Sequence, residues 1–353
     1  MTSNKIGCAV IGHGGMGSWH AAQMAKNPEM QWIGAFDILP ERTRGMPAKI
    51  GGMAFSSREE LLADPRISLV TVATPNDVHK EIVIAALEAG KNVISEKPVA
   101  MSSAELDEMI AVAERAGRLF TVHQNRRWDG DYLIIKRLLD DNTLGPVFAI
   151  ESRVHGSRGI PGDWRNRKVH GGGMVLDWGI HILDQALMVT QPRKLTSVYA
   201  QLLHVTNTDC DDGFRATLKF DDGLTYIAEV GTSNFINLPR WYMLGENGSA
   251  VIRDWSCNGE IVMVSDWENR DAVPILAGAG LTKTMAPRTK ETIASYPLPA
   301  VKADTGEFYR NVAAVVRGAA APLVTHAQQR RLMKLIEAIF QSGENNEVVR
   351  LDL

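Results

Sequence analysis

Three residues whose side chains can carry protons or charge stand out in the sequence: Lys97, Asp177 and His181. Asp177 and His181 lie four residues apart in a predicted helix, so we expect them on one face of it, with Asp184 further along that face. Three interpretations of this helix stay open: an acid–base pair, a metal site, and a buried histidine that pairs with Asp184. No specific additional ligand accompanies the pair, so no metal is expected.

A glycine-rich segment near the N-terminus has the spacing of a dinucleotide site. Gly12, Gly14 and Gly17 form G-x-G-x-x-G between a predicted strand and a predicted helix. The first glycine permits a tight turn, the second lets the backbone approach a pyrophosphate, and the third allows close helix packing. The next strand ends in Asp37, where a carboxylate would bind the adenosine ribose diol and repel a 2′-phosphate. The expected cofactor is therefore NAD.

Alternating strands and helices are expected to position these residues. Strands are predicted at 6–11, 31–37, 69–74, 92–95 and 119–124, with helices at 16–26, 41–49, 77–89 and 104–116 between them. This order is typical of a doubly wound parallel sheet, the Rossmann arrangement. Beyond a helix near 171–190, strands at 197–205, 214–220, 224–230 and 248–253 follow one another directly, which predicts an α+β domain with an antiparallel sheet. We expect domains at 1–125 and 126–353, the second including C-terminal helices.

Composition excludes several classes of protein. The chain has 353 residues, 45% hydrophobic and 22% charged, with a net charge of −3, so it is globular and not a typical nucleic-acid binder. Its three cysteines have no metal-binding or disulfide spacing, and the first apolar stretch is too short for a membrane span or signal. The expected location is cytoplasmic, with a small-molecule partner and neither nucleic acid nor membrane.

Five motifs in order resemble the glucose-fructose oxidoreductase / inositol dehydrogenase family. They are V-I-G-H-G-G-M-G at 10–17, A-T-P-N-D-V-H at 73–79, S-E-K-P at 95–98, G-G-G-M-V-L-D-W-G-I-H at 171–181 and G-E-N-G-S at 245–249. The resemblance implies an NAD-binding Rossmann domain and a C-terminal open, mainly antiparallel sheet that meets neighbouring subunits. It also implies NAD-dependent chemistry on a sugar, glycoside or cyclitol, by a homo-oligomer, dimer or tetramer.

The resemblance assigns roles to the residues. His181 would be the base, because an unperturbed imidazole titrates near working pH, and Asp177 would orient it or the hydroxyl. Lys97 would stabilise the alkoxide or relay the proton, and the sequence leaves open which of Lys97 and His181 takes the proton first. The cofactor-binding set implied is Gly12, His13, Gly14, Gly15, Met16, Gly17, Asp37, Thr74, Asn76, His79, Glu96, Lys97 and Asn125. The substrate-binding set is Arg126, Trp128, His155, Trp164, Arg165, Asp177 and His181.

Two further stretches are expected to be loops. Residues 151–170 are polar and locally basic, and fit either a solvated rim or a wall of the site in which Trp164 stacks on a sugar and Arg165 binds an anion or hydroxyls. Residues 270–299 predict a long insertion that could close over the cleft.

The predicted activity is oxidation of a secondary hydroxyl, or reduction of the ketone, by hydride transfer to or from nicotinamide. One alternative remains open, a redox-neutral glycosidase or lyase that oxidises only transiently. A non-catalytic sensor of nicotinamide or sugar is disfavoured, because Lys97, Asp177 and His181 are all present in their motifs. Net NADH formation without cleavage of the carbon skeleton distinguishes the dehydrogenase from the lyase.

Overall fold

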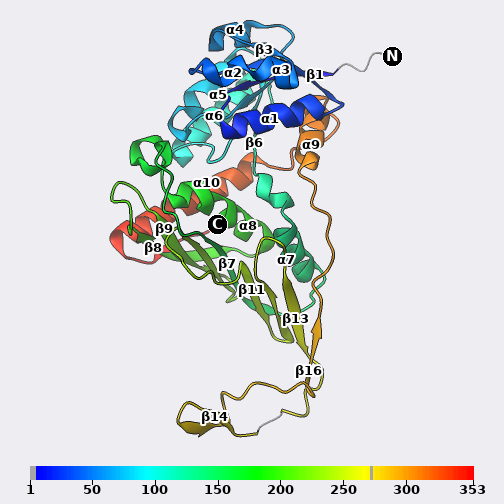
Figure 1. Ribbon diagram of the computed structural model, residues 1–353, viewed down its shortest axis with the longest axis vertical. Coiled ribbons are helices and arrows are strands. Elements are labelled where there is room, and N and C mark those ends of the chain that lie inside the picture. The colour runs from blue at the N-terminus through cyan, green and yellow to red at the C-terminus, as the bar shows by residue number, and fades with distance from the viewer. Residues whose placement is uncertain (1–4, 271–272) are drawn as a thin grey trace.

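The computed structural model describes residues 5–270 and 273–353 and contains two sheets with their covering helices (Figure 1). The N-terminal sheet is parallel, in the order β3-β2-β1-β4-β5-β6. Its strands are β1 (Ile6–Ile11), β2 (Met30–Phe36), β3 (Met53–Ala54), β4 (Leu69–Val72), β5 (Asn92–Ser95) and β6 (Phe120–Val122). Its helices are α1 (Gly15–Lys26), α2 (Glu41–Arg44), α3 (Met46–Ile50), α4 (Arg58–Ala63), α5 (His79–Glu88) and α6 (Ser103–Ala116). The Rossmann prediction is confirmed.

Local sequence explains these elements. The strands β1, β4 and β5 are buried along their whole length, which suits a sheet covered by helices on both faces. Helix α6 begins where the Ser102 hydroxyl accepts a hydrogen bond from the Glu105 amide, and ends at Gly117, whose φ of 60° a glycine adopts without strain. The order of strands reverses between β1 and β4, and ligands bind at the carboxyl ends of strands beside such a switch point.

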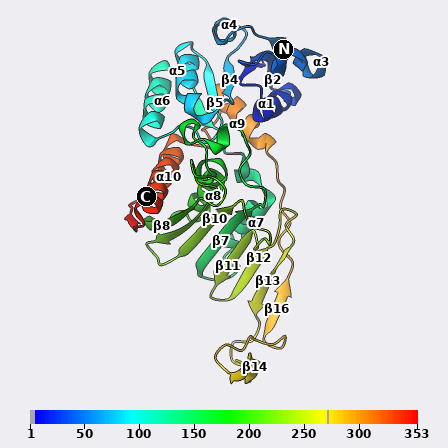
Figure 2. The same cartoon turned by 60° about the vertical axis from the view of Figure 1, so that its left-hand side comes forward.

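The second sheet is large, open and mainly antiparallel, as predicted. Its order is β16-β13-β12-β11-β7-β10-β9-β8-β17, and within this sheet only β7 and β10 pair in parallel among its described strands. The strands are β7 (Val147–His155), β8 (Leu195–Leu203), β9 (Gly213–Phe220), β10 (Thr225–Gly231), β11 (Trp241–Gly245), β12 (Gly248–Ile252), β13 (Gly259–Val264), β16 (Ile293–Tyr296) and β17 (Val349–Arg350). Helices α8 (Ile180–Val189) and α10 (His326–Asn345) lie between this sheet and the N-terminal domain, whereas α7 (Gly130–Asp140) runs alongside the sheet (Figures 1 and 2).

Three local predictions were wrong. Residues 151–155 are not a loop, because they belong to β7, whose residues Ile150, Ser152 and Val154 face the core. The helix expected at 41–49 is divided at Gly45 into α2 and α3. The helix expected near 171–190 starts as a π-helix over Val175–Gly179 and becomes α-helical only in α8.

The last third of the chain contacts both domains. The predicted insertion at 270–299 contains the hairpin β14 (Ile275–Ala277) and β15 (Gly280–Thr282), which projects beyond the end of the large sheet, whereas residues 271–272 lie outside the described part (Figures 1 and 2). Helix α9 (Gly306–Val316) returns to the N-terminal domain. There Tyr309 contacts His20 of α1, and Arg317 pairs with Glu29. The boundary predicted at residue 125 therefore assigns α9 to the second domain although it packs on the first.

No helix within the described residues is long and apolar enough to cross a membrane. The thiols of Cys8, Cys210 and Cys257 are free.

Candidate active site

A cavity of about 860 Å³ follows the carboxyl ends of the parallel strands. It extends from the glycine-rich turn and Asp37, past Thr74 and Asn76, to Glu96, Lys97 and Asp177. Because these residues follow β1, β2, β4 and β5, the doubly wound topology brings them to one edge of the sheet. The cavity is large and elongated enough to serve as a dinucleotide site.

The glycine-rich turn fits a pyrophosphate. Gly12 has a φ of +89°, and a Cβ there would lie 2.6 Å from the carbonyl oxygen of Ala73. A Cβ at Gly17 would lie 1.8 Å from the carbonyl oxygen of Gly12, so this glycine is required for packing. By contrast, the space beside Gly14 and Gly15 is open, and both line the cavity together with Met16. The open backbone lies at the N-terminus of α1, where amides and the helix dipole attract phosphate.

The Asp37 carboxylate lies at the opposite end of this cavity from Lys97. Its oxygens accept hydrogen bonds from the amides of His13, at 2.7 Å, and Leu39, at 2.9 Å. Sequence reasoning missed Arg42, which follows Asp37 by five residues, lines the same cavity and lies 3.5 Å from the Asp37 carboxylate. An arginine five residues after Asp37 is visible in the sequence, but only the loop before α2 turns Arg42 back towards the Asp37 carboxylate.

The remaining residues of the predicted cofactor set occupy different places. Thr74 and Asn76 line the cavity, and the Asn76 amide donates to the carbonyl oxygen of Gly171 at 2.8 Å. His79 is fully buried, with ring nitrogens 2.9 Å from the carbonyl oxygens of Thr74 and Pro98, so it braces the surrounding loops. His13 and Asn125 are not among the residues lining the cavity. Their predicted role in binding NAD stays a prediction.

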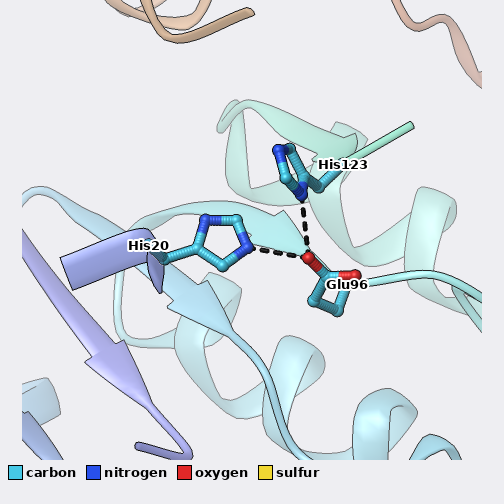
Figure 3. Close-up of side chains that lie close together, drawn as sticks. All are labelled: His20, Glu96 and His123. Carbon is cyan, nitrogen blue, oxygen red and sulfur yellow. Dashed lines mark hydrogen bonds and ion pairs between the residues drawn. The ribbon is translucent and has the colours of Figure 1, made fainter. Parts of the chain in front are cut away.

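Glu96 lines the cavity and also joins a buried cluster with His20 and His123 (Figure 3). One carboxylate oxygen lies 2.8 Å from His20 Nε2 and 2.8 Å from His123 Nδ1, and the other accepts the Lys97 amide at 3.0 Å. Tyr309 of α9 lies 2.7 Å from the remaining ring nitrogen of His20. The two histidines were not predicted, because α1 and β6 are far apart in the sequence and only the fold brings them to Glu96.

The cluster fixes the charge of Glu96. Burial by itself would raise the pKa of Glu96, but its contacts with His123 and His20 outweigh burial and hold the pKa well below its usual range. Burial and the neighbouring His123 lower the pKa of His20 to about 4. Glu96 is thus a carboxylate at neutral pH, and it anchors the backbone at the position of Lys97.

Lys97 and Asp177 meet at the end of the cavity. Lys97 Nζ donates to the Asp177 carbonyl oxygen at 2.8 Å and lies 3.4 Å from its carboxylate. Arg165 Nε lies 3.6 Å from the same carboxylate. The π-helix that carries Asp177 is itself a common feature of functional sites. Lys97 and Asp177 are 80 residues apart in the sequence, so the spacing of residues along the chain did not predict their contact.

His181 lies deeper than the sequence analysis expected. It is 5% exposed, its Nδ1 is buried without a hydrogen-bond partner, and its ring packs edge-on against Trp178 at 5.7 Å. Asp184 is not its partner, because Asp184 pairs with Arg127 at 2.6 Å. Burial, followed by the charges of Lys97 and Arg126, lowers the pKa of His181 well below its usual range. The ring is therefore neutral at neutral pH.

A second cavity, of about 540 Å³, adjoins the first and shares Arg165 and Asp177 with it. Arg126 and His155 line this second cavity, whereas Trp164 lines the first. Trp128 lies outside both, with its indole nitrogen 2.9 Å from Glu307. Two cavities that meet at Asp177 beside Lys97 fit a cofactor and a substrate that react at their junction.

Comparison with known proteins identifies the class of protein. Residues 6–124 match the family model described as "Oxidoreductase family, NAD-binding Rossmann fold", and residues 132–251 match the GFO/IDH/MocA C-terminal domain. The chain belongs to this family of oxidoreductases, and its cofactor is NAD, as the sequence predicted.

Particular relatives extend over most of the chain. A solved structure, an NAD-binding protein from Listeria innocua, is 46% identical, with a TM-score of 0.93, and the match covers 98% of this chain and 99% of that one. The scyllo-inositol 2-dehydrogenase (NADP(+)) IolW of Bacillus subtilis is 29% identical over 301 residues, 83% of this chain and 82% of the relative. The D-glucoside 3-dehydrogenase of Escherichia coli is 28% identical over 247 residues, 67% of this chain and 69% of the relative.

Proposed function

We propose that the protein oxidises a secondary hydroxyl of a sugar, glycoside or cyclitol, or reduces the corresponding ketone. The observation that carries this proposal is the junction of the two cavities, where Lys97 contacts Asp177 and Arg165 is shared. NAD bound in the larger cavity supplies a hydride acceptor. The relatives named for inositol and glucoside dehydrogenation support a polyhydroxylated ring as the substrate.

The protein's own groups then perform three tasks. The Lys97 ammonium, held by Asp177, donates a hydrogen bond to the reacting oxygen and stabilises it as the proton leaves. His181 lines neither cavity, but it lies one helical turn beyond Asp177 and its Nδ1 has no hydrogen-bond partner, so we assign it as the group that takes this proton. The expectation that His181 titrates near working pH is wrong, because its pKa is lowered. A lowered pKa makes the protonated His181 ring a stronger acid, which returns the proton readily when the ketone is reduced.

The proposal is tested by incubating the protein with NAD and a panel of inositols, aldoses and methyl glycosides. NADH absorbance is followed, and the carbon products are identified by NMR. We expect NADH and one keto product in equal amounts for at least one polyol ring. A protein that binds NAD but forms no NADH with any member of the panel would contradict the proposal. Cleavage of a glycoside without net NADH would do so as well.

A further inference from the structure

More cationic than anionic side chains line the substrate cavity. The described residues that line it include Arg126, Arg158 and Arg165. Asp177 is the only residue with a carboxylate among these described lining residues. We propose that the substrate carries an anionic substituent, a carboxylate or a phosphate on the sugar or cyclitol ring, and that Arg126 and Arg158 bind it. This inference rests on the proposed function and adds the chemical class of its substrate.

Of the three arginines that line this cavity, Arg126 pairs with Asp129 at 2.8 Å and Arg165 pairs with Asp163 at 2.7 Å, so only Arg158 lacks a counter-charge among the described residues. Asp177 contacts Lys97 and Arg165, at 3.4 and 3.6 Å, so its charge is already shared between two cations. Arg158 is exposed and forms no ion pair with any residue in the described ranges. A planar guanidinium of this kind matches a carboxylate or phosphate with two parallel hydrogen bonds.

Arg126 is held in a fixed orientation. Its guanidinium lies 4.3 Å from the ring centre of Trp178 and 5.2 Å from that of Trp255, and its Nη1 donates to Asp129 at 2.8 Å. Asp129 does not line the cavity, whereas Arg126 does. The Nε of Arg126 is buried without a partner. A cation that is already oriented loses little freedom when it binds an anion.

The rest of the cavity suits a sugar ring. Besides the arginines, the lining includes the apolar side chains of Val154, Met174 and Pro161 and parts of Trp178 and Trp255, which can contact the C–H groups of a ring. An anionic group held by Arg126 and Arg158 would orient the ring so that one hydroxyl faces Asp177 and Lys97. Charge therefore selects both the substrate and the position that is oxidised.

The test uses matched pairs of compounds: methyl glucoside with methyl glucuronide, and glucose with glucose 6-phosphate. Rates are measured with NAD for the parent and for Arg158→Gln, which replaces an exposed side chain. Arg167→Gln is the control, because Arg167 is an exposed arginine of the same segment that lines neither cavity. We expect the anionic member of one pair to be preferred, and the arm that responds identifies carboxylate or phosphate.

In Arg158→Gln, the KM of the preferred anion should rise by about 10- to 100-fold, as expected for a charge-assisted pair, while the neutral partner and the control remain unchanged. Oxidation of neutral compounds with equal or higher kcat/KM would overturn this inference and leave the proposed function standing. If no compound is oxidised, calorimetric titration of the NAD-loaded protein separates the two. Binding of an anion that depends on Arg158 would support the anion site and contradict only the proposed oxidation. If no anion bound, the inference of an anion site would be overturned.

Discussion

The substitution Asp37→Ser should change cofactor preference, and the structure allows the change to be estimated. Asp37 lines the cavity at the end where adenosine would lie, and the residue is 5% exposed. Charge-assisted hydrogen bonds to the ribose diol contribute about 1.5–3 kcal/mol, so NAD affinity should fall about 10- to 100-fold. A 2′-phosphate roughly 6 Å from this carboxylate is repelled by about 3 kcal/mol at an effective dielectric constant of about 20.

Arg42 supplies the second half of the effect. It lies 3.5 Å from the Asp37 carboxylate, and removal of that carboxylate frees its guanidinium to bind the 2′-phosphate. The ratio of NADPH to NADH affinity should therefore rise by about 100-fold or more in Asp37→Ser. The control is Asp37→Ser combined with Arg42→Gln, in which most of the gain in NADPH affinity should disappear.

Fluorescence titration with NADH and NADPH measures both affinities and needs no knowledge of the substrate. The parent should prefer NADH. If Asp37→Ser weakened both cofactors equally, Asp37 would serve only to hold the loop through the amides of His13 and Leu39, and the reasoning would be refuted. Equal affinity of the parent for both cofactors would refute it as well.

Four other predictions concern the site, stability and assembly. Lys97→Met should lower turnover by about 10²–10³-fold with NADH affinity retained, whereas lost NADH binding would assign Lys97 to the cofactor. In the parent, the acid limb of the pH–rate curve should lie well below pH 6.5, because the pKa of His181 is lowered, and His181→Gln should remove this limb. The variant should also lose about 1–3 kcal/mol of unfolding free energy in urea, more than expected of a cleft-facing ring, because His181 is 5% exposed. Unchanged turnover and an unchanged pH profile would contradict its role as the base. The pKa of His20 is lowered from 6.5 to about 4, so the unfolded chain binds more protons between these values. His20 alone should lower the free energy of unfolding by about 2 kcal/mol between pH 7 and pH 5, and the lowered pKa values of His79 and His181 add to this fall. A constant free energy of unfolding in urea would contradict this. The large sheet exposes Tyr242 and Tyr296, at 36% and 51%, and should pair with another copy, so a monomer in light scattering at micromolar concentration would be the contrary result.

The dinucleotide site could be predicted from the sequence because its signals are local. The turn at Gly12–Gly17, the buried runs of β1 and β5, and Asp37 at the end of β2 are each encoded within a short segment, and the doubly wound topology then determines where they meet. The strand at 92–95 was predicted to the residue, as was the helix end at Gly117. Helix α7 and strands β7 and β11 were not predicted. In β7, Glu151, Arg153 and His155 look like a loop when the sheet that buries their neighbours is unknown.

The chemistry of the site was decided by tertiary contacts. The sequence put Asp177 and His181 on one helical face, but the π-helix and the packing of Lys97 make Lys97 and Arg165 the partners of Asp177, and burial lowers the pKa of His181. The cluster around Glu96 joins α1, the end of β5, the end of β6 and α9, which no spacing rule connects. Residue types and local periodicity are properties of short segments, whereas burial, charge pairing and pKa depend on neighbours from distant parts of the chain, and folding alone brings those neighbours together.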